Sequence, residues 1–226
     1  MTIESSAAKS WPLVGTASVV DVLERRGIDG VMLAGARGNG SFAGPALTAD
    51  ITTAAQAQET QDDPVDPVDP AALWRNLDTA APGSVLVICT HAQPLTVVGG
   101  VTAATALGRG LAGIVTDGRI RDSDEIRDYG LPIRYGSSDP RAMRNLIRVR
   151  ACGRPVRFGD VEVAPGDIIV GDGDGVVCVP RHLADEVFKD AITVEGQERV
   201  WAATSRVLGS IQAGYEIVTK VHGSPH

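Results

Sequence analysis

Four charged side chains follow a buried apolar segment in the middle of the chain. Asp117, Arg119, Arg121 and Asp122 come directly after the strand-like residues 113–116. Carboxylate oxygens are the ligands that hard divalent cations prefer, and a guanidinium pairs with a carboxylate in bidentate fashion. Ligands of open α/β sheets bind at this end of the strands. The pattern predicts a site for a cation and an organic acid. A solvated loop whose charges pair with one another and cap the next helix fits the spacing equally well.

A pair of glycines precedes a predicted helix over residues 101–109. Gly99 and Gly100 leave the backbone unobstructed, and the amides of the first helical turn, including those of Val101 and Thr102, have no partner within a helix. Such a terminus binds carboxylates or phosphates, although paired glycines also occur in simple tight turns. The segment lacks the GxGxxG spacing of a dinucleotide site.

Two other motifs resemble reactive sites less closely. Cys89 and His91 follow a predicted strand, but no third group is evident to orient them as a nucleophile and its base, and a small buried cysteine is the favoured interpretation. Residues 171–175, Gly-Asp-Gly-Asp-Gly, lack the acidic residue that ends a calcium-binding EF-hand loop, so they predict a turn.

The composition of the chain fits one globular domain over residues 1–226. The net charge of -7 argues against a nucleic-acid surface, which needs concentrated positive charge. Three widely spaced cysteines favour a reducing compartment, and we see neither a signal peptide nor an apolar run long enough to cross a bilayer. We therefore expect a soluble, cytoplasmic protein.

Strand-like and helix-like segments alternate along the chain, which predicts an α/β domain with a mixed sheet. Proline-rich, acidic residues 58–70 predict an exposed loop, Gly44-Pro45 predicts a bend in a strand, and a helical arm is expected from about residue 183. Helices are predicted at 16–26, 73–80 and 101–109 and from 123, and strands at 41–48, 85–88, 113–116, 131–135, 156–163, 165–170 and 175–179.

Four segments, taken in order, resemble the RraA-like family from about Val14 to the final helix. These are Phe42–Thr48, Pro82–Val87, Arg109–Asp122 and Pro165–Pro180. The most specific part is the combination of Asp-Gly-x-x-Arg-Asp with a later Gly-Asp-x-Asp-Gly-Val-Val-x-Val-Pro. The resemblance implies a β/β/α swivelling-type sandwich with a mixed central sheet flanked by helices. It also implies a homotrimer or homohexamer with active sites between subunits.

The aldolase branch of this family implies a metal-dependent lyase that acts on a short 2-oxo acid. By resemblance, Asp122 binds Mg²⁺ or Mn²⁺, Arg121 contacts the pyruvyl group, and the amides of residues 99–102 bind the substrate carboxylate. The implied reactions are cleavage of a 4-hydroxy-2-oxo acid and decarboxylation of oxaloacetate, both through a pyruvate enolate. An acidic residue from the C-terminal helix of a neighbouring subunit is expected near the metal, with Glu195 and Glu198 as candidates.

This chain departs from the aldolase branch at three places. Gly100 stands where an acidic residue is usual, and Cys89-Thr90 stands where Asp-Gly is usual. Arg119 also replaces a small apolar residue. Loss of outer-shell carboxylates weakens a metal site. The alternatives are therefore a diverged enzyme of a specialised pathway, such as an isomerase or dehydratase, and a non-catalytic regulator that binds a ribonuclease.

Overall fold

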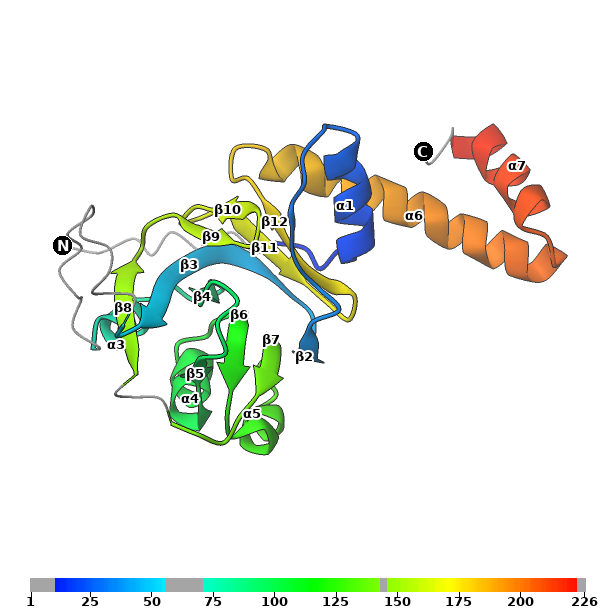
Figure 1. The fold of residues 1–226 in the computed structure, drawn as a ribbon. Helices are drawn as coiled ribbons and strands as arrows, with labels where there is room; N and C mark the ends of the chain where they lie inside the picture. Colours follow the sequence, from blue (N-terminus) through cyan, green and yellow to red (C-terminus); the bar gives the residue numbers. More distant parts are fainter. Residues whose placement is uncertain (1–10, 56–70, 143–145, 223–226) are drawn as a thin grey trace, which may run out of the picture.

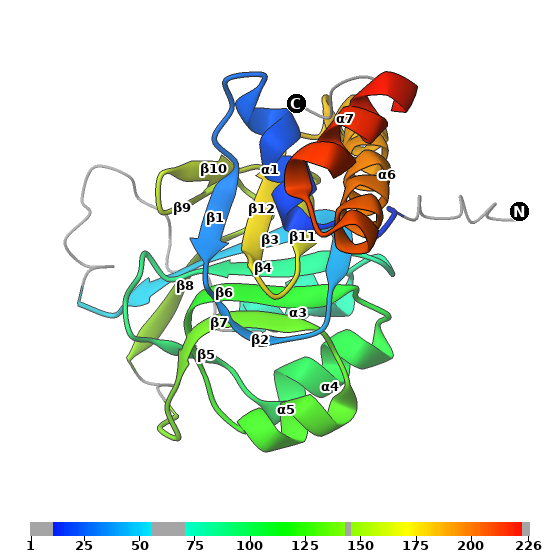
Figure 2. The ribbon, with the colours of Figure 1, turned by 90° about the vertical axis from the view of Figure 1, so that its right-hand side faces the viewer.

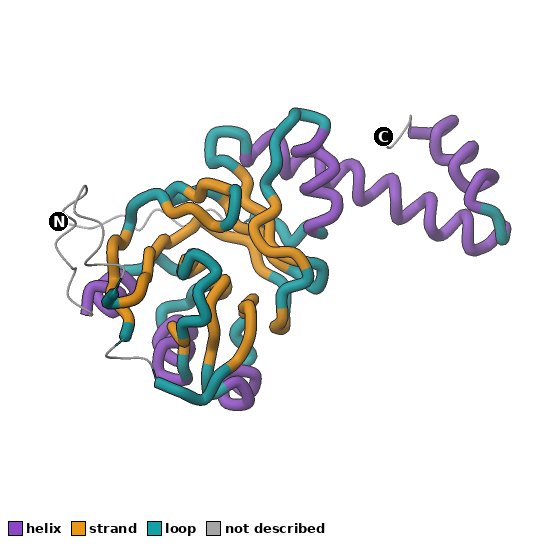
Figure 3. The backbone as a smooth tube through the Cα atoms, viewed as in Figure 1, coloured by secondary structure: helices purple, strands orange, loops and turns teal. Residues whose placement is uncertain are grey.

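The computed structural model describes residues 11–55, 71–142 and 146–222, which form a mixed sheet with helices on its outer sides (Figures 1 and 3). The predicted loop at 58–70 lies outside the described residues. The strands are β1 (Val31–Ala34), β2 (Arg37–Asn39), β3 (Phe42–Thr53), β4 (Val85–Cys89), β5 (Thr96–Val98), β6 (Gly113–Ile120), β7 (Ile133–Ser138), β8 (Ile147–Cys152), β9 (Val156–Phe158), β10 (Val161–Val163), β11 (Ile168–Gly171) and β12 (Gly175–Val179). The helices are α1 (Thr16–Glu24), α3 (Ala71–Asp78), α4 (Gly100–Gly108), α5 (Ser123–Tyr129), α6 (Ala184–Leu208) and α7 (Ile211–His222).

The main sheet runs in the order β1-β12-β11-β3-β4-β6-β7-β2, with β5 beside β6 and β8 beside β3. Its centre is parallel, because β3, β4, β6 and β7 pair in one direction, whereas the strands at both edges are antiparallel. All five residues of β4 are buried, as expected of a parallel strand covered on both faces. The predicted mixed sheet flanked by helices is confirmed.

Three apolar clusters hold the layers together. One packs α3, α4 and α5 against the central strands, and a second packs the β9–β10 hairpin against their other face. The third seats α1 and the start of α6 on β11 and β12. Figure 2 shows α4 and α5 together below the sheet, on the opposite side of the molecule from α1, α6 and α7.

The predicted C-terminal arm is a long helix followed by a shorter one. Its first half packs through side chains such as Val187 and Val194, after which α6 leaves the body of the molecule and α7 folds back along it (Figure 1). No helix within the described ranges combines the length and apolar character that crossing a membrane requires.

The observed strands differ from the predicted ones in their bounds and number. β3 continues unbroken through Gly44-Pro45, where a bend is predicted, because Pro45 lies one residue before β3 begins to pair with β4 at Ala46, so its missing N–H breaks no bond there. The strand expected to end at residue 116 continues to Ile120. Strands β1, β2, β5 and β8 were not predicted, and residues 156–163, predicted as one strand, form the two strands β9 and β10.

Candidate active site

Arg121 and Asp122 lie where β6 ends and α5 begins. Asp122 adopts a left-handed backbone conformation, with φ 57° and ψ 37°, which Asp tolerates better than most residues. Although Asp122 holds the N-cap position of α5, its carboxylate turns away to the neighbouring helix, where its Oδ2 accepts a hydrogen bond of 3.0 Å from the Gly100 amide. Arg121 Nε lies 3.4 Å from the same oxygen. The pair is therefore tied to the glycine turn.

The glycine turn brings the start of α4 close to this pair. Gly99 is extended and provides no side-chain cap, so the amides of Val101 and Thr102 project from the end of the helix without a carbonyl partner inside it. A Cβ added to Gly99 would lie 3.0 Å from Asp122 Oδ2 and 3.1 Å from Arg121 Nε. Only glycine permits so close an approach without displacing the pair.

One pocket of about 460 Å³ is lined by Arg121 together with Gly99, Val101 and Thr102. The cationic side chain and the exposed helix terminus thus face the same space, and both favour an anion. Asp122 and Gly100 stand directly behind this surface through their mutual hydrogen bond. The structure therefore brings together the predicted pair and the predicted carboxylate-binding turn.

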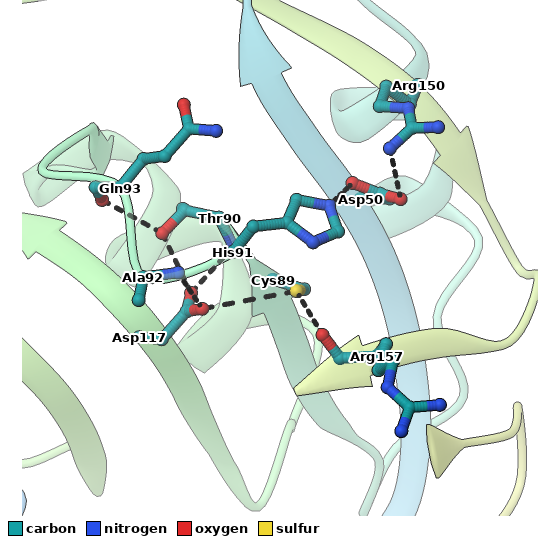
Figure 4. A network of polar contacts seen from close by, with 9 residues as sticks. All are labelled: Asp50, Cys89, Thr90, His91, Ala92, Gln93, Asp117, Arg150 and Arg157. Carbon is teal, nitrogen blue, oxygen red and sulfur yellow. Dashed lines mark hydrogen bonds and ion pairs between the residues drawn. The ribbon is translucent and has the colours of Figure 1, made fainter. Parts of the chain in front are cut away.

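Asp117 and Arg119 do not join this pocket. Both lie within β6, and side chains two residues apart point to the same face of a strand, here the face away from α4. The Asp117 carboxylate accepts hydrogen bonds from the Thr90 amide at 2.6 Å, the Thr90 hydroxyl at 2.8 Å and the Ala92 amide at 2.8 Å (Figure 4). Arg119 donates to Asp139 at 2.8 Å. These two residues hold loops in place.

Cys89 and His91 do not form a reactive pair. Burial raises the pKa of the Cys89 thiol to about 12, and the thiol donates to the Arg157 carbonyl at 3.0 Å. The His91 ring turns instead to Asp50, 2.7 Å away, and Arg150 approaches that carboxylate from the other side (Figure 4). A thiol with so high a pKa carries almost no thiolate at neutral pH, so the interpretation as a buried structural cysteine holds.

The Gly171–Gly175 segment is the predicted turn, between β11 and β12. Asp172 accepts hydrogen bonds from the amide and hydroxyl of Thr16, at 2.8 and 2.7 Å, and so anchors the first residue of α1. Its Oδ1 also accepts from the Asp174 amide. The acidic side chain of this loop is thus used to cap a helix.

Glu195 and Glu198 lie on α6, across the molecule from α5 (Figure 2). Glu195 pairs with Arg199 one turn later, at 2.5 Å. Neither glutamate meets Asp122 within one chain. The expectation that they act on a neighbouring subunit stays a prediction.

Glu125, in the first turn of α5, lies beside Gly100 although it is not among the site residues predicted from the sequence. A Cβ added to Gly100 would collide with the Glu125 carboxylate, which therefore occupies the space that a side chain at position 100 would enter. Tyr129 donates a hydrogen bond to Glu125, and this bond raises the pKa of the Tyr129 phenol. The signal was present in the sequence, because residues three apart on a helix share a face, and Glu125 is three residues after Asp122.

Comparisons with known proteins agree with this architecture. The model of the family described as "Aldolase/RraA", RraA-like, matches residues 16–178, more than half of the chain. The "putative 4-hydroxy-4-methyl-2-oxoglutarate aldolase" of Halalkalibacterium halodurans is 33% identical over 117 residues, which are 50% of this chain and 53% of that protein. The chain spans about half the length of the curated relatives it matches.

Solved structures extend the likeness over most of the fold. An uncharacterised protein from Pseudomonas syringae pv. tomato superposes with a TM-score of 0.76 at 28% identity, covering 89% of this chain and 88% of that one. Streptomyces coelicolor RraAS2, described as an unusual member of the RNase ES inhibitor RraA protein family, gives 0.69 at 32% identity, covering 82% and 90%. Because the family model matches residues 16–178, the chain belongs to the RraA-like family.

Proposed function

We propose that the protein is a divalent-metal-dependent lyase that breaks a C–C bond of a short 2-oxo acid. The expected reactions are cleavage of a 4-hydroxy-2-oxo acid and decarboxylation of oxaloacetate. The observation that carries the proposal is the pocket that Arg121 and the start of α4 line together, with Asp122 held beside them by the Gly100 amide. The aldolase name of a relative supports the reaction class.

The residues present fit a magnesium or manganese ion that keeps most of its waters. The described residues contain no group of three or more His, Cys, Asp or Glu side chains that could enclose a metal. Mg²⁺, however, is commonly held by one or two carboxylates together with waters and substrate oxygens. Asp122 would be the protein ligand, because its carboxylate is 38% exposed and the Gly100 amide and Arg121 fix its orientation.

The chemistry divides among a few groups. Bound Mg²⁺ or Mn²⁺ supplies Lewis acidity that favours the enolate form of pyruvate. Arg121 would stabilise the negative charge that develops on the 2-oxo oxygen. The amides of Val101 and Thr102 would bind the substrate carboxylate at the positive end of α4.

Glu125 would replace the outer carboxylate that the chain lacks at Gly100. Its carboxylate already lies against Gly100, whose amide holds Asp122, and the Tyr129 hydroxyl fixes its direction. Carboxylates in this outer position orient the groups around a metal and commonly change affinity or rate by about 10–100-fold. The predicted loss of polar support at Gly100 is therefore offset by a side chain from α5.

We also propose that the protein is a homo-oligomer, a trimer or a hexamer. The far half of α6 and α7 carry exposed apolar side chains away from the body of the molecule, among them Val207, Ile211 and Val221. Apolar surface of this kind is typical of interfaces. Light scattering coupled to size exclusion would measure the assembly, and a monomer at micromolar concentration would reject this part of the proposal.

The enzymatic proposal is tested with purified protein, Mg²⁺ or Mn²⁺, and either oxaloacetate or 4-hydroxy-4-methyl-2-oxoglutarate. We expect pyruvate release, deuterium exchange into the methyl group of pyruvate, and loss of both on chelation. A folded protein that shows neither would refute the lyase. Capture of a ribonuclease by that inactive protein would support the regulatory alternative instead.

A further inference from the structure

The pocket beside Arg121 is much larger and more apolar than pyruvate requires. Its volume of about 460 Å³ is in the range of sites for whole small molecules, whereas pyruvate has three carbons. Beyond Arg121 and the start of α4, its walls include apolar side chains from four elements: Ile51 of β3, Leu73 and Trp74 of α3, Val97 and Val98 of β5, and Ile147 and Val149 of β8. The pocket therefore has room for a substrate that extends past its pyruvyl end.

The charged side chains on the pocket walls determine whether the part of the substrate beyond the pyruvyl group can carry a second negative charge. Arg121 is the one charged side chain among the described residues that line the pocket. Arg148 and Arg150 alternate with Ile147 and Val149 along β8 and so point to the other face of the strand. With Arg121 and the α4 amides engaged by the pyruvyl end, a second carboxylate would meet no other cationic side chain among the described lining residues, which are mostly apolar, and burying it there is costly.

We infer that this pocket selects monocarboxylic 2-oxo acids with a large apolar substituent, aromatic or branched aliphatic, over dicarboxylic ones. The inference rests on the proposed function for the placement of the pyruvyl group. The apolar group would lie between the Trp74 ring and the aliphatic walls from β3 and β8. Trp74 is 64% exposed, so its indole offers free apolar area to a ligand.

For an aryl substrate the reaction is a retro-aldol cleavage. In 4-hydroxy-4-phenyl-2-oxobutanoate the bond between the third and fourth carbons breaks. The hydroxyl proton leaves as that oxygen becomes the carbonyl of benzaldehyde. The electron pair left on the third carbon takes up a proton to form the methyl group of pyruvate. One substrate thus gives one pyruvate and one benzaldehyde, with no oxidant or reductant.

Binding is measured by calorimetry with Mg²⁺ and two stable probes, 2-oxo-4-phenylbutanoate and 2-oxoglutarate. We expect the phenyl acid to bind at least about tenfold more tightly, because its ring buries apolar area while the second carboxylate of 2-oxoglutarate loses water. Trp74→Ala should weaken the phenyl acid by about tenfold and leave pyruvate binding unchanged. Leu107→Ala, on an exposed part of α4 outside the pocket, is the matched control.

A gain-of-function variant tests the charge argument separately. Val101 is 82% exposed and lines the pocket, so Val101→Lys adds a cation without disturbing the core. This variant should bind 2-oxoglutarate more tightly than the wild-type protein does and reverse the preference. Equal or tighter binding of 2-oxoglutarate by the wild-type protein would overturn the inference, as would a phenyl-acid affinity that Trp74→Ala does not change.

Turnover separates this inference from the lyase proposal. If oxaloacetate and 4-hydroxy-4-methyl-2-oxoglutarate are cleaved faster than 4-hydroxy-4-phenyl-2-oxobutanoate, the lyase stands and the selectivity is wrong. If none is cleaved but the phenyl acid binds selectively at the Trp74 wall, the ligand class stands and the lyase is wrong.

Discussion

Replacing Asp122 by Asn and by Ala should separate its structural role from its chemical one. Asn tolerates the left-handed backbone at φ 57° and retains an oxygen that accepts from the Gly100 amide. We expect Asp122→Asn to change the free energy of unfolding by less than about 0.5 kcal/mol. Asp122→Ala should lose about 1–2 kcal/mol from backbone strain and about 1 kcal/mol from the hydrogen bond.

The two variants should therefore differ in stability but agree in activity. For a domain of this size the alanine variant should melt roughly 4–12 °C below the wild type, while the asparagine variant melts close to it. Both should lose at least about 100-fold in pyruvate release, because each lacks the proposed metal-binding carboxylate. Calorimetry and a coupled pyruvate assay measure the two effects. Equal destabilisation would refute the backbone argument, and an active asparagine variant would refute the metal ligand.

Three further predictions concern groups outside the pocket. Arg134 is 3% exposed and donates hydrogen bonds to the carbonyls of Gly40, Ile133 and Asp172. Arg134→Met should therefore lower the free energy of unfolding, measured in urea, by about 3 kcal/mol. A change below about 1 kcal/mol would contradict this expectation. Burial alone would raise the pKa of Asp172, but hydrogen bonds from Thr16, Asp174 and Gly175 outweigh it and keep the pKa below its ordinary 3.8. The stabilisation is therefore complete above that value and is lost as pH falls through the lower folded pKa. The stability difference between wild type and Asp172→Asn should accordingly be large at pH 7 and shrink in acid, and a pH-independent difference would argue against the linkage. Cys89, with a pKa of about 12, should resist iodoacetamide at pH 8 until the protein is unfolded, as mass spectrometry of the alkylated peptides would show; rapid labelling of the native protein would contradict its burial.

Local sequence predicted the parallel centre of the sheet better than its edges. Residues 85–88 and 113–116 are continuous apolar runs, which is what strands covered on both faces require. Strands β1 and β8 carry mixed exposure and gain their place from distant partners, β12 and β3. Such pairings depend on tertiary contacts, which no short window of sequence contains.

Local sequence likewise predicted only part of the arrangement of the candidate site, because that arrangement also depends on tertiary contacts. The sequence singles out Arg121 and Asp122 because they follow a recognisable strand, and Gly99 and Gly100 because they begin a recognisable helix. Asp117 and Arg119 were grouped with them because β6 was expected to end four residues too early. Because the strand continues to Ile120, both side chains belong to β6, where Asp117 bonds to Thr90 and Ala92 and Arg119 bonds to Asp139.

The two faces of β6 carry different groups, and this explains how the site can be built without acidic side chains at Cys89, Thr90 and Gly100. On the face away from α4, Cys89 is a buried thiol and Asp117 is committed to Thr90 and Ala92, so the loop after β4 supplies no free acid to the pocket. On the α4 face, the Gly100 amide holds Asp122, and the absence of a side chain at Gly100 leaves the space that Glu125 fills. The substitution that removes one carboxylate thus makes room for another from α5. We therefore expect Gly100→Asp to displace Glu125 without raising the rate of pyruvate release, whereas Glu125→Gln alone should lower that rate.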